Sequence, residues 1–222
     1  MLPTTSSSAA TKRSNARQRS SLLWLYFRRL LKPTQMDFQY AFWTMIQLAK
    51  SPKTAYKHTS YHKQTKNQWA RDDPAFVVIQ SALLAVVAFI YAAFFSPAWS
   101  RTLSAALSAV LFDYLTLGSI IATAGWTLAN KYLKRRHSHN SHAVDQSVEW
   151  MYAFDIHCNA YFPMFLILHV LQLFLIPILT RQSIVASLVS CFIYFLGMAY
   201  YLYVSFLGYS TLPFLEQTEV FL

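Results

Sequence analysis

Four long runs of apolar residues, separated by short polar segments, fill the last two thirds of the chain. A helix that spans a bilayer needs about 20 mostly apolar residues, because the hydrocarbon core is roughly 30 Å thick and each residue adds 1.5 Å. The runs of this length predict membrane spans at residues 74–95, 103–129, 161–180 and 183–208. The pattern therefore predicts an all-α fold, a polytopic transmembrane helix bundle.

The chain before the first span divides into two parts. Residues 1–32 form a basic, serine-rich arm that we expect to be disordered or to lie at a membrane surface. Residues 33–73 form an amphipathic segment, and residues 74–222 form the transmembrane domain. Within the amphipathic segment, an apolar stripe recurs at helical spacing and consists of Phe38, Phe42, Met45, Ile46 and Ala49. Such a helix either presents a platform to lipid or a partner, or packs against the bundle.

Charge is distributed very unevenly along the sequence. The first 73 residues hold 13 of the 19 Lys and Arg residues, and the remaining residues carry equal numbers of basic and acidic groups. A sparsely charged, aromatic-rich body with no net charge excludes intrinsic disorder for the last two thirds of the chain. The composition of the N-terminal arm also fits a mitochondrial transit peptide, and no cleavable signal peptide is recognisable.

The basic residues near the span ends predict the orientation in the membrane. The four segments that precede or follow the first three spans carry 13, 1, 4 and 1 basic residues. Lys and Arg accumulate on the cytoplasmic side of membranes. The alternation therefore predicts a cytosolic N-terminus, cytosolic amphipathic helices, a cytosolic 130–160 loop and a cytosolic C-terminus, with the lipid bilayer as a partner.

Two ionisable residues fall inside predicted spans, Asp113 in the second and His169 in the third. Antiparallel spans place them at similar depth, where an unpaired carboxylate is costly, so they form a candidate intramembrane polar pair. One alternative is a transporter or enzyme that moves a proton along this pair. The other alternative is that each side chain forms hydrogen bonds that specify helix packing.

Acidic, histidine and aromatic residues are dense just before the third predicted span. Asp155 and His157 are candidate acid–base partners or metal ligands. The preferred interpretation is that Glu149, Asp155 and His157 pair with basic residues such as Lys66 and Arg71, which would hold the N-terminal segment against the bundle. A histidine tract at residues 137–142 is a weak metal-binding signal, and we expect a solvated loop there, with no metal site and no cofactor.

Several unusual stretches occur in a fixed order along the chain. They are QMDF at residues 35–38, KQTKNQWARDDPAF at 63–76, EW at 149–150 with YAFDIH at 152–157, and FLGYSTLPFL at 206–215. Together they strongly resemble the uncoordinated-fifty family of Golgi multi-pass membrane proteins. The resemblance covers roughly residues 33–215.

The resemblance implies a Golgi membrane protein that acts in vesicular trafficking by binding rather than by catalysis. It implies recruitment of large Sec7-domain exchange factors for Arf GTPases and cell-surface delivery of receptor cargo. The endoplasmic reticulum and the inner nuclear membrane are further locations. RNA binding has been reported for an animal member, but no RNA-binding fold signature accompanies the basic arm here. Family members usually continue into a fifth hydrophobic segment, which would begin near Leu222.

We expect a cytosolic cap to carry the binding function. Its candidate residues are Lys66, Trp69, Arg71, Asp72, Asp73, Glu149, Trp150, Asp155 and His157. The family has no recognised catalytic residues, so the resemblance implies none in this chain.

Overall fold

The computed structural model describes residues 26, 28–66, 68–95, 99–135 and 146–222. Within these residues the chain is helical, and its only extended pairing is a bridge between Lys134 and Leu215. Four helical stretches are long and apolar enough to cross a membrane: Ala75–Phe95, Trp99–Tyr132, Trp150–Leu179 and Ile184–Ser210. The all-α transmembrane bundle predicted from the hydrophobic pattern is therefore confirmed.

Two of the four spans change helix type part-way along. The first span is α4 (Ala75–Phe95) and the fourth is α9 (Ile184–Ser210). The second consists of α5 (Trp99–Ser108), the π-helical segment η2 (Ala109–Thr116) and α6 (Leu117–Tyr132). The third consists of α7 (Trp150–Phe165), the π-helical segment η3 (Leu166–Leu171) and α8 (Gln172–Leu179). The π-helix is rare and frequently occurs at functional sites.

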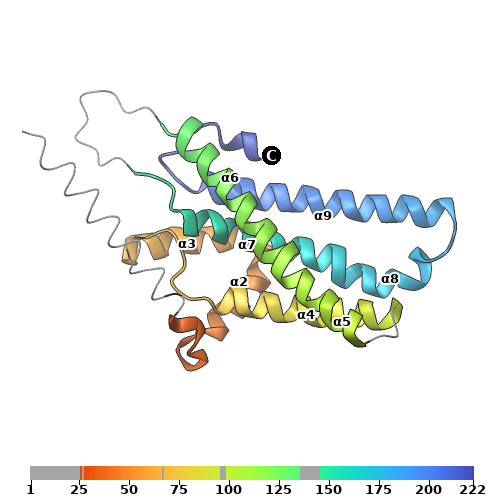
Figure 1. Cartoon of the computed structure of the whole chain (residues 1–222). Coiled ribbons are helices and arrows are strands. Elements are labelled where there is room, and N and C mark those ends of the chain that lie inside the picture. The colour runs from red at the N-terminus through yellow and green to blue at the C-terminus, as the bar shows by residue number, and fades with distance from the viewer. Residues whose placement is uncertain (1–25, 27, 67, 96–98, 136–145) are drawn as a thin grey trace, which may run out of the picture.

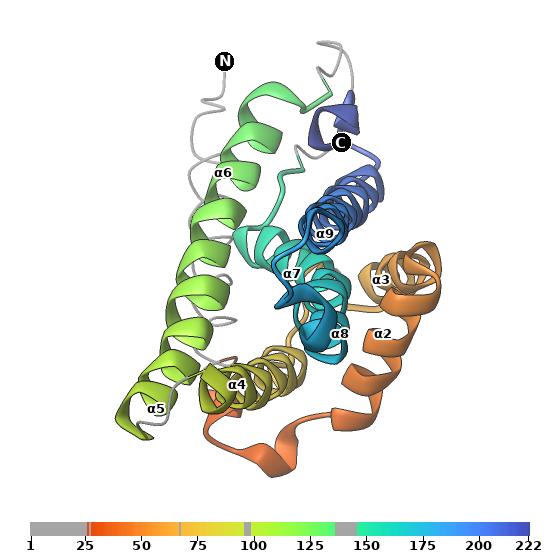
Figure 2. The same cartoon turned by 90° about the vertical axis from the view of Figure 1, so that its right-hand side faces the viewer.

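Helix α7 is the central element of the bundle. Every residue from Tyr152 to Pro163 is buried, and α7 packs against α2, α4, α6 and α9. Figure 2 looks nearly along α4, α8 and α9, while α6 passes obliquely at one side of the bundle. We call the end of the bundle where α4 and α7 begin and α6 and α9 end the capped end, and the opposite end the far end.

The amphipathic segment forms two helices, α2 (Phe38–Lys50) and α3 (Pro52–Lys66), after a short turn η1 (Pro33–Gln35). Helix α2 lies across the direction of the spans and packs on α4 and α7 (Figures 1 and 2). Its buried face is Ala41, Thr44, Met45 and Leu48. The predicted stripe differs from this face: only Met45 is buried, whereas Phe42 and Ile46 are about half exposed.

Two span boundaries also differ from the hydropathy prediction. The second span extends at both ends beyond 103–129, and the third begins at Trp150 rather than near residue 161. Residues 150–160 are therefore helix, not part of a 130–160 loop. Their polar side chains lower the local hydropathy, but Asp155, His157 and Asn159 are buried against protein rather than exposed to lipid.

Side-chain caps fix several helix starts. The Asp73 carboxylate accepts a hydrogen bond from the backbone N–H of Ala75 at 3.0 Å, at the start of α4. Asp37 accepts from the Tyr40 N–H at 2.9 Å, and Ser183 accepts from the Ala186 N–H at 3.1 Å. Each cap satisfies a backbone donor that the first helical turn leaves free.

Candidate binding site at the capped end

The segment between α3 and α4 is held in place from both sides. The second carboxylate oxygen of Asp73 accepts from the backbone N–H of Asp37 at 2.6 Å, so one side chain joins the starts of α2 and α4. The Arg29 guanidinium donates to the carbonyl oxygen of Asp72 at 2.8 Å and lies 3.4 Å from its carboxylate. These contacts fix the backbone that follows Arg71.

Arg71 connects this segment to the central helix α7. Its backbone N–H donates to Asp155 Oδ2 at 2.7 Å, and its Nε lies 3.5 Å from Oδ1. The guanidinium also donates to the side-chain oxygen of Asn159 and lies 4.2 Å from the centre of the Phe76 ring. The side chains of Arg71 and Asp155 are 18% and 6% exposed, so the pair is largely withdrawn from water. Removing one partner of such a pair typically costs about 3–5 kcal/mol.

The charge state of Arg71 follows from these neighbours. Burial alone lowers the pKa of the guanidinium, but the negative charge of Asp155 and further neighbouring groups raise it by more. The net pKa lies above its ordinary value, so Arg71 stays cationic at any physiological pH. Burial has the opposite effect on the nearby Tyr56 hydroxyl: it raises the pKa, so this hydroxyl stays protonated. Arg71 is therefore a fixed positive charge rather than a proton-transfer group.

Glu149 and Trp150 hold the start of α7 against its neighbours. Although Glu149 occupies the N-cap position, its side chain does not cap α7 and instead accepts from the Ala70 N–H at 3.3 Å. The indole N–H of Trp150 donates to Thr123 Oγ1 on α6 at 3.0 Å. Trp69 is buried with its ring centre 6.0 Å from that of Tyr152 on α7.

His157 has a different environment from the one expected. It lies inside the bundle, 3% exposed, with Nδ1 2.8 Å from the Tyr201 hydroxyl of α9. Of its predicted basic partners, Arg71 pairs with Asp155 instead, and the side chain of Lys66 lies outside the described residues. Aromatic rings of Tyr114, Phe154, Tyr161 and Tyr201 surround the imidazole.

Comparison with known proteins identifies the family of the chain. The family model described as the UNC-50 family matches residues 26–222. The chain belongs to the UNC-50 family. A protein unc-50 homolog of Dictyostelium discoideum is 50% identical over 210 residues, which cover 94% of this chain and 80% of the relative. The human homolog is 43% identical over 198 residues, covering 89% of this chain and 74% of the relative. No solved structure matches the chain.

The intramembrane candidates of this UNC-50 family member occupy the two π-helical segments. Asp113 lies in η2 with an exposed side chain, and His169 lies half-buried in η3. The His169 carbonyl accepts from the Tyr91 hydroxyl at 3.0 Å. Among the described residues no hydrogen bond or ion pair joins Asp113 to His169, and no cluster of three potential metal ligands occurs. The histidine tract at 137–142 falls entirely outside the described residues.

Some residues of the candidate site at the capped end were not predicted from the sequence. Asn159 lies four residues after Asp155, on the same face of α7, so helical spacing alone would have indicated it. Arg29 and Tyr201 reach the site from segments distant in sequence, and no local pattern marks them. Their contacts with Asp72 and His157 depend on how the helices pack together.

Proposed function

We propose that this chain is a Golgi membrane protein that acts by binding in vesicular trafficking. It recruits cytosolic trafficking factors of the Arf exchange-factor class and supports cell-surface delivery of membrane receptors. The proposal rests on membership of the UNC-50 family and on the resemblance of the motifs, which meet at the capped end. The basic residues at this end favour a cytosolic orientation.

The observation that carries the proposal is a rigid basic surface at the capped end. Helix α3 has no acidic residue, and Lys53 and Lys57 are exposed on it. The Arg71–Asp155 pair and the Asp73 contacts fix the chain that follows α3. A fixed, positively charged surface suits recognition of an acidic face on a soluble partner, because complementary charge steers association.

A double substitution tests the proposed surface. We expect Lys53→Glu with Lys57→Glu to leave abundance and Golgi localisation intact while recruitment of a Sec7-domain factor to Golgi membranes falls severalfold. Quantitative imaging of the tagged factor in cells that lack the endogenous chain measures recruitment. The matched control, Arg101→Glu with Arg181→Glu, changes the same charge at the far end and leaves recruitment unchanged. Unaltered recruitment in the α3 variant would contradict the proposal.

Charge reversal tests the connection beneath the surface. Arg71→Glu places two carboxylates together in a buried site, so we expect loss of folding or of Golgi localisation. Adding Asp155→Arg restores an opposite-charge pair and should recover part of the stability. Melting temperature in detergent and steady-state abundance are the measurements. Normal localisation and normal recruitment in Arg71→Glu alone would refute a structural role for the pair.

A second candidate is an intramembrane transporter or enzyme that uses Asp113 and His169. One observation favours it: both residues lie in π-helical segments, which frequently mark functional sites. It predicts that Asp113→Asn abolishes function without changing abundance or localisation. Loss of abundance in that variant would instead assign Asp113 a structural role.

A further inference from the structure

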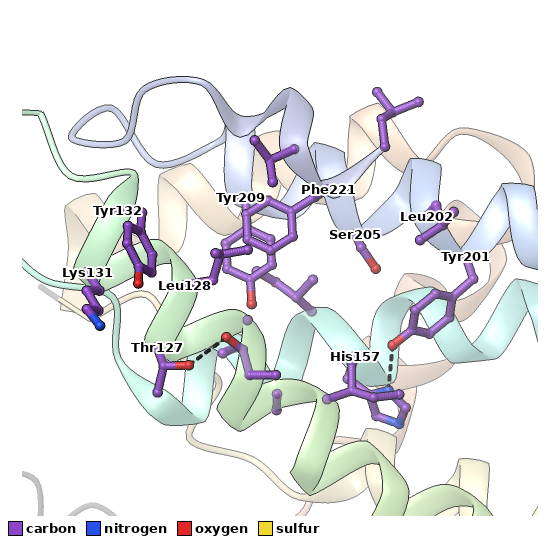
Figure 3. A pocket seen from close by; sticks show the side chains of 18 residues that line it. Thr127, Leu128, Lys131, Tyr132, His157, Tyr201, Leu202, Ser205, Tyr209 and Phe221 are labelled. Atoms are coloured by element: carbon purple, nitrogen blue, oxygen red, sulfur yellow. Dashed lines mark hydrogen bonds between the residues drawn. The ribbon is translucent and has the colours of Figure 1, made fainter.

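A groove lies between α6, α7 and α9 in the half of the bundle nearer the capped end. Its volume is about 790 Å³, within the usual range of ligand pockets, and the C-terminal turn η4 (Thr218–Phe221) borders one side (Figure 3). Helices α6 and α9 both pack on α7 but scarcely on one another, so they leave the groove between them. We propose that this groove binds one anionic phospholipid of the adjacent leaflet.

The dimensions of the groove fit a single acyl chain. Its wall on α6 runs from Ile121 to Tyr132, which corresponds to about 16 Å along the helix axis. That length is about half of the hydrocarbon core, so the groove extends through one leaflet. Ile121 and Leu202 on its two walls are 39% and 41% exposed, and they face the hydrocarbon at its lateral opening.

The floor of the groove does not disfavour an apolar chain. Two of its polar members, His157 and Tyr201, are joined by the 2.8 Å hydrogen bond between Nδ1 and the hydroxyl. The other imidazole nitrogen of His157, Nε2, is already buried without a hydrogen-bond partner among the described residues. The Thr127 hydroxyl on the wall donates to the Ala124 carbonyl of its own helix at 2.8 Å. An acyl chain in the groove breaks neither of these hydrogen bonds, and it takes no water from His157 Nε2, which the protein already buries.

The charge at the mouth selects the headgroup. Lys131 and Tyr132 lie at the end of α6, and the Lys131 ammonium is 5.0 Å from the centre of the Tyr132 ring. Within the described part of the chain no acidic side chain pairs with Lys131, whereas the neighbouring Arg135 is paired with Glu216 at 2.6 Å. An exposed cation beside an interfacial tyrosine attracts the phosphate of an anionic lipid.

A second copy of the chain is a poorer occupant than a lipid. Docking of two chains through this groove about a twofold axis would bring their Lys131 side chains together, and like charges repel. A lipid phosphate at the same place compensates the charge. The lipid inference is independent of the trafficking function proposed above.

Photolabelling in vesicles tests the site. The full chain is reconstituted with phosphatidylserine or phosphatidylcholine that carries a diazirine in one acyl chain, and cross-linked peptides are mapped by mass spectrometry. We expect phosphatidylserine to label α6 and α9 within the groove several times more than phosphatidylcholine. Equal labelling by the two lipids, or labelling spread evenly over all lipid-facing helices, overturns the proposal.

Two pairs of substitutions test separately how the charge of Lys131 and the volume of the groove contribute to lipid labelling. Lys131→Gln should lower groove labelling by phosphatidylserine about fivefold, as expected for one basic group near an anionic surface. Arg101→Gln removes the same charge at the far end and should leave it unchanged. Leu202→Trp fills the groove and should abolish the labelling, whereas Leu188→Trp, an equivalent change elsewhere on α9, should not.

Native mass spectrometry supplies an independent measurement. One retained anionic lipid per chain, lost in Leu202→Trp, supports the site. A dimer without lipid assigns the groove to a second copy and overturns the proposal. If Leu202→Trp lowers the melting temperature, Lys131→Gln still tests the lipid site. The Lys131 side chain is exposed, so replacing it leaves no cavity in the protein.

Discussion

At the scale of single residues, close packing around α7 depends on glycines at particular contacts. A methyl group at Gly118 of α6 would lie 2.5 Å from Cδ2 of His157 and closer still to Nε2. His157 cannot easily move away, because Tyr201 holds its ring from the other side at 2.8 Å. The absence of a side chain at Gly118 is therefore what allows α6 to approach α7.

We expect Gly118→Ala to destabilise the protein by about 1–3 kcal/mol, the usual cost of an overpacked core. The melting temperature in detergent measures the effect. In a His157→Ala background the added methyl group has space, so Gly118→Ala should there cost little. The exposed neighbour substitution Thr116→Ala serves as a control. Equal costs of Gly118→Ala in the two backgrounds would disprove the contact.

At the scale of elements, the hydrophobic pattern predicted all four spans found in the described residues, but not every boundary. Long apolar runs are sufficient to locate spans, because lipid imposes length and hydropathy directly. The start of α7 was missed because Asp155, His157 and Asn159 are paired within the protein, and a local sequence window contains no information on distant partners. The buried face of α2 was misassigned for a related reason: both faces carry apolar residues, and only the position of α4 and α7 selects one.

Shortening a side chain on either face of α2 should have different effects on stability. Leu48→Ala should cost about 2–5 kcal/mol, because Leu48 is fully buried and its loss leaves a cavity. Phe42→Ala, on the half-exposed face, should cost much less in detergent. Thermal unfolding of the two purified variants is the comparison. A larger effect at Phe42 would mean that the predicted stripe, rather than the observed face, contacts the bundle.

The cap at the start of α4 gives a second prediction at this scale. Asp73→Ala removes acceptors for the backbone N–H groups of Ala75 and Asp37, so we expect a loss of about 1–2 kcal/mol. Asp73→Asn retains one side-chain oxygen and should retain part of the stability. Hydrogen exchange at the first turns of α2 and α4 reports the loss locally. Unchanged exchange in Asp73→Ala would show that the cap contributes nothing.

At the scale of the whole molecule, the four candidate spans of the described residues run between the capped end and the far end, so we expect these ends at opposite membrane surfaces. The family and the bundle could be predicted from sequence motifs, hydropathy and charge. The individual pairs of the candidate site could be predicted only in part: spacing allows Arg71 to meet Asp155, but nothing local indicates that His157 turns towards Tyr201. Such contacts depend on the relative placement of α6, α7 and α9.

The proposed orientation predicts which connections are accessible in sealed Golgi vesicles. Ser147→Cys, near the start of α7, should react with a membrane-impermeant maleimide added outside. Arg181→Cys, between α8 and α9, should react only after detergent is added. The background needs Cys191→Ser, since Cys191 is exposed whereas Cys158 is buried. The reverse labelling pattern would invert the topology.

The ion pair between Arg71 and Asp155 also has a consequence for synthesis of the chain. Its partners are separated by 84 positions. At ribosomal rates of about 5–20 residues per second, Arg71 emerges roughly 4–17 s before Asp155 is made. During that interval the guanidinium lacks its partner carboxylate on Asp155, so the contact that joins its segment to α7 cannot form. Insertion of the third span is therefore the event that completes the connection between Arg71 and α7, and a nascent chain stalled before it would expose a segment not yet joined to α7 to quality control.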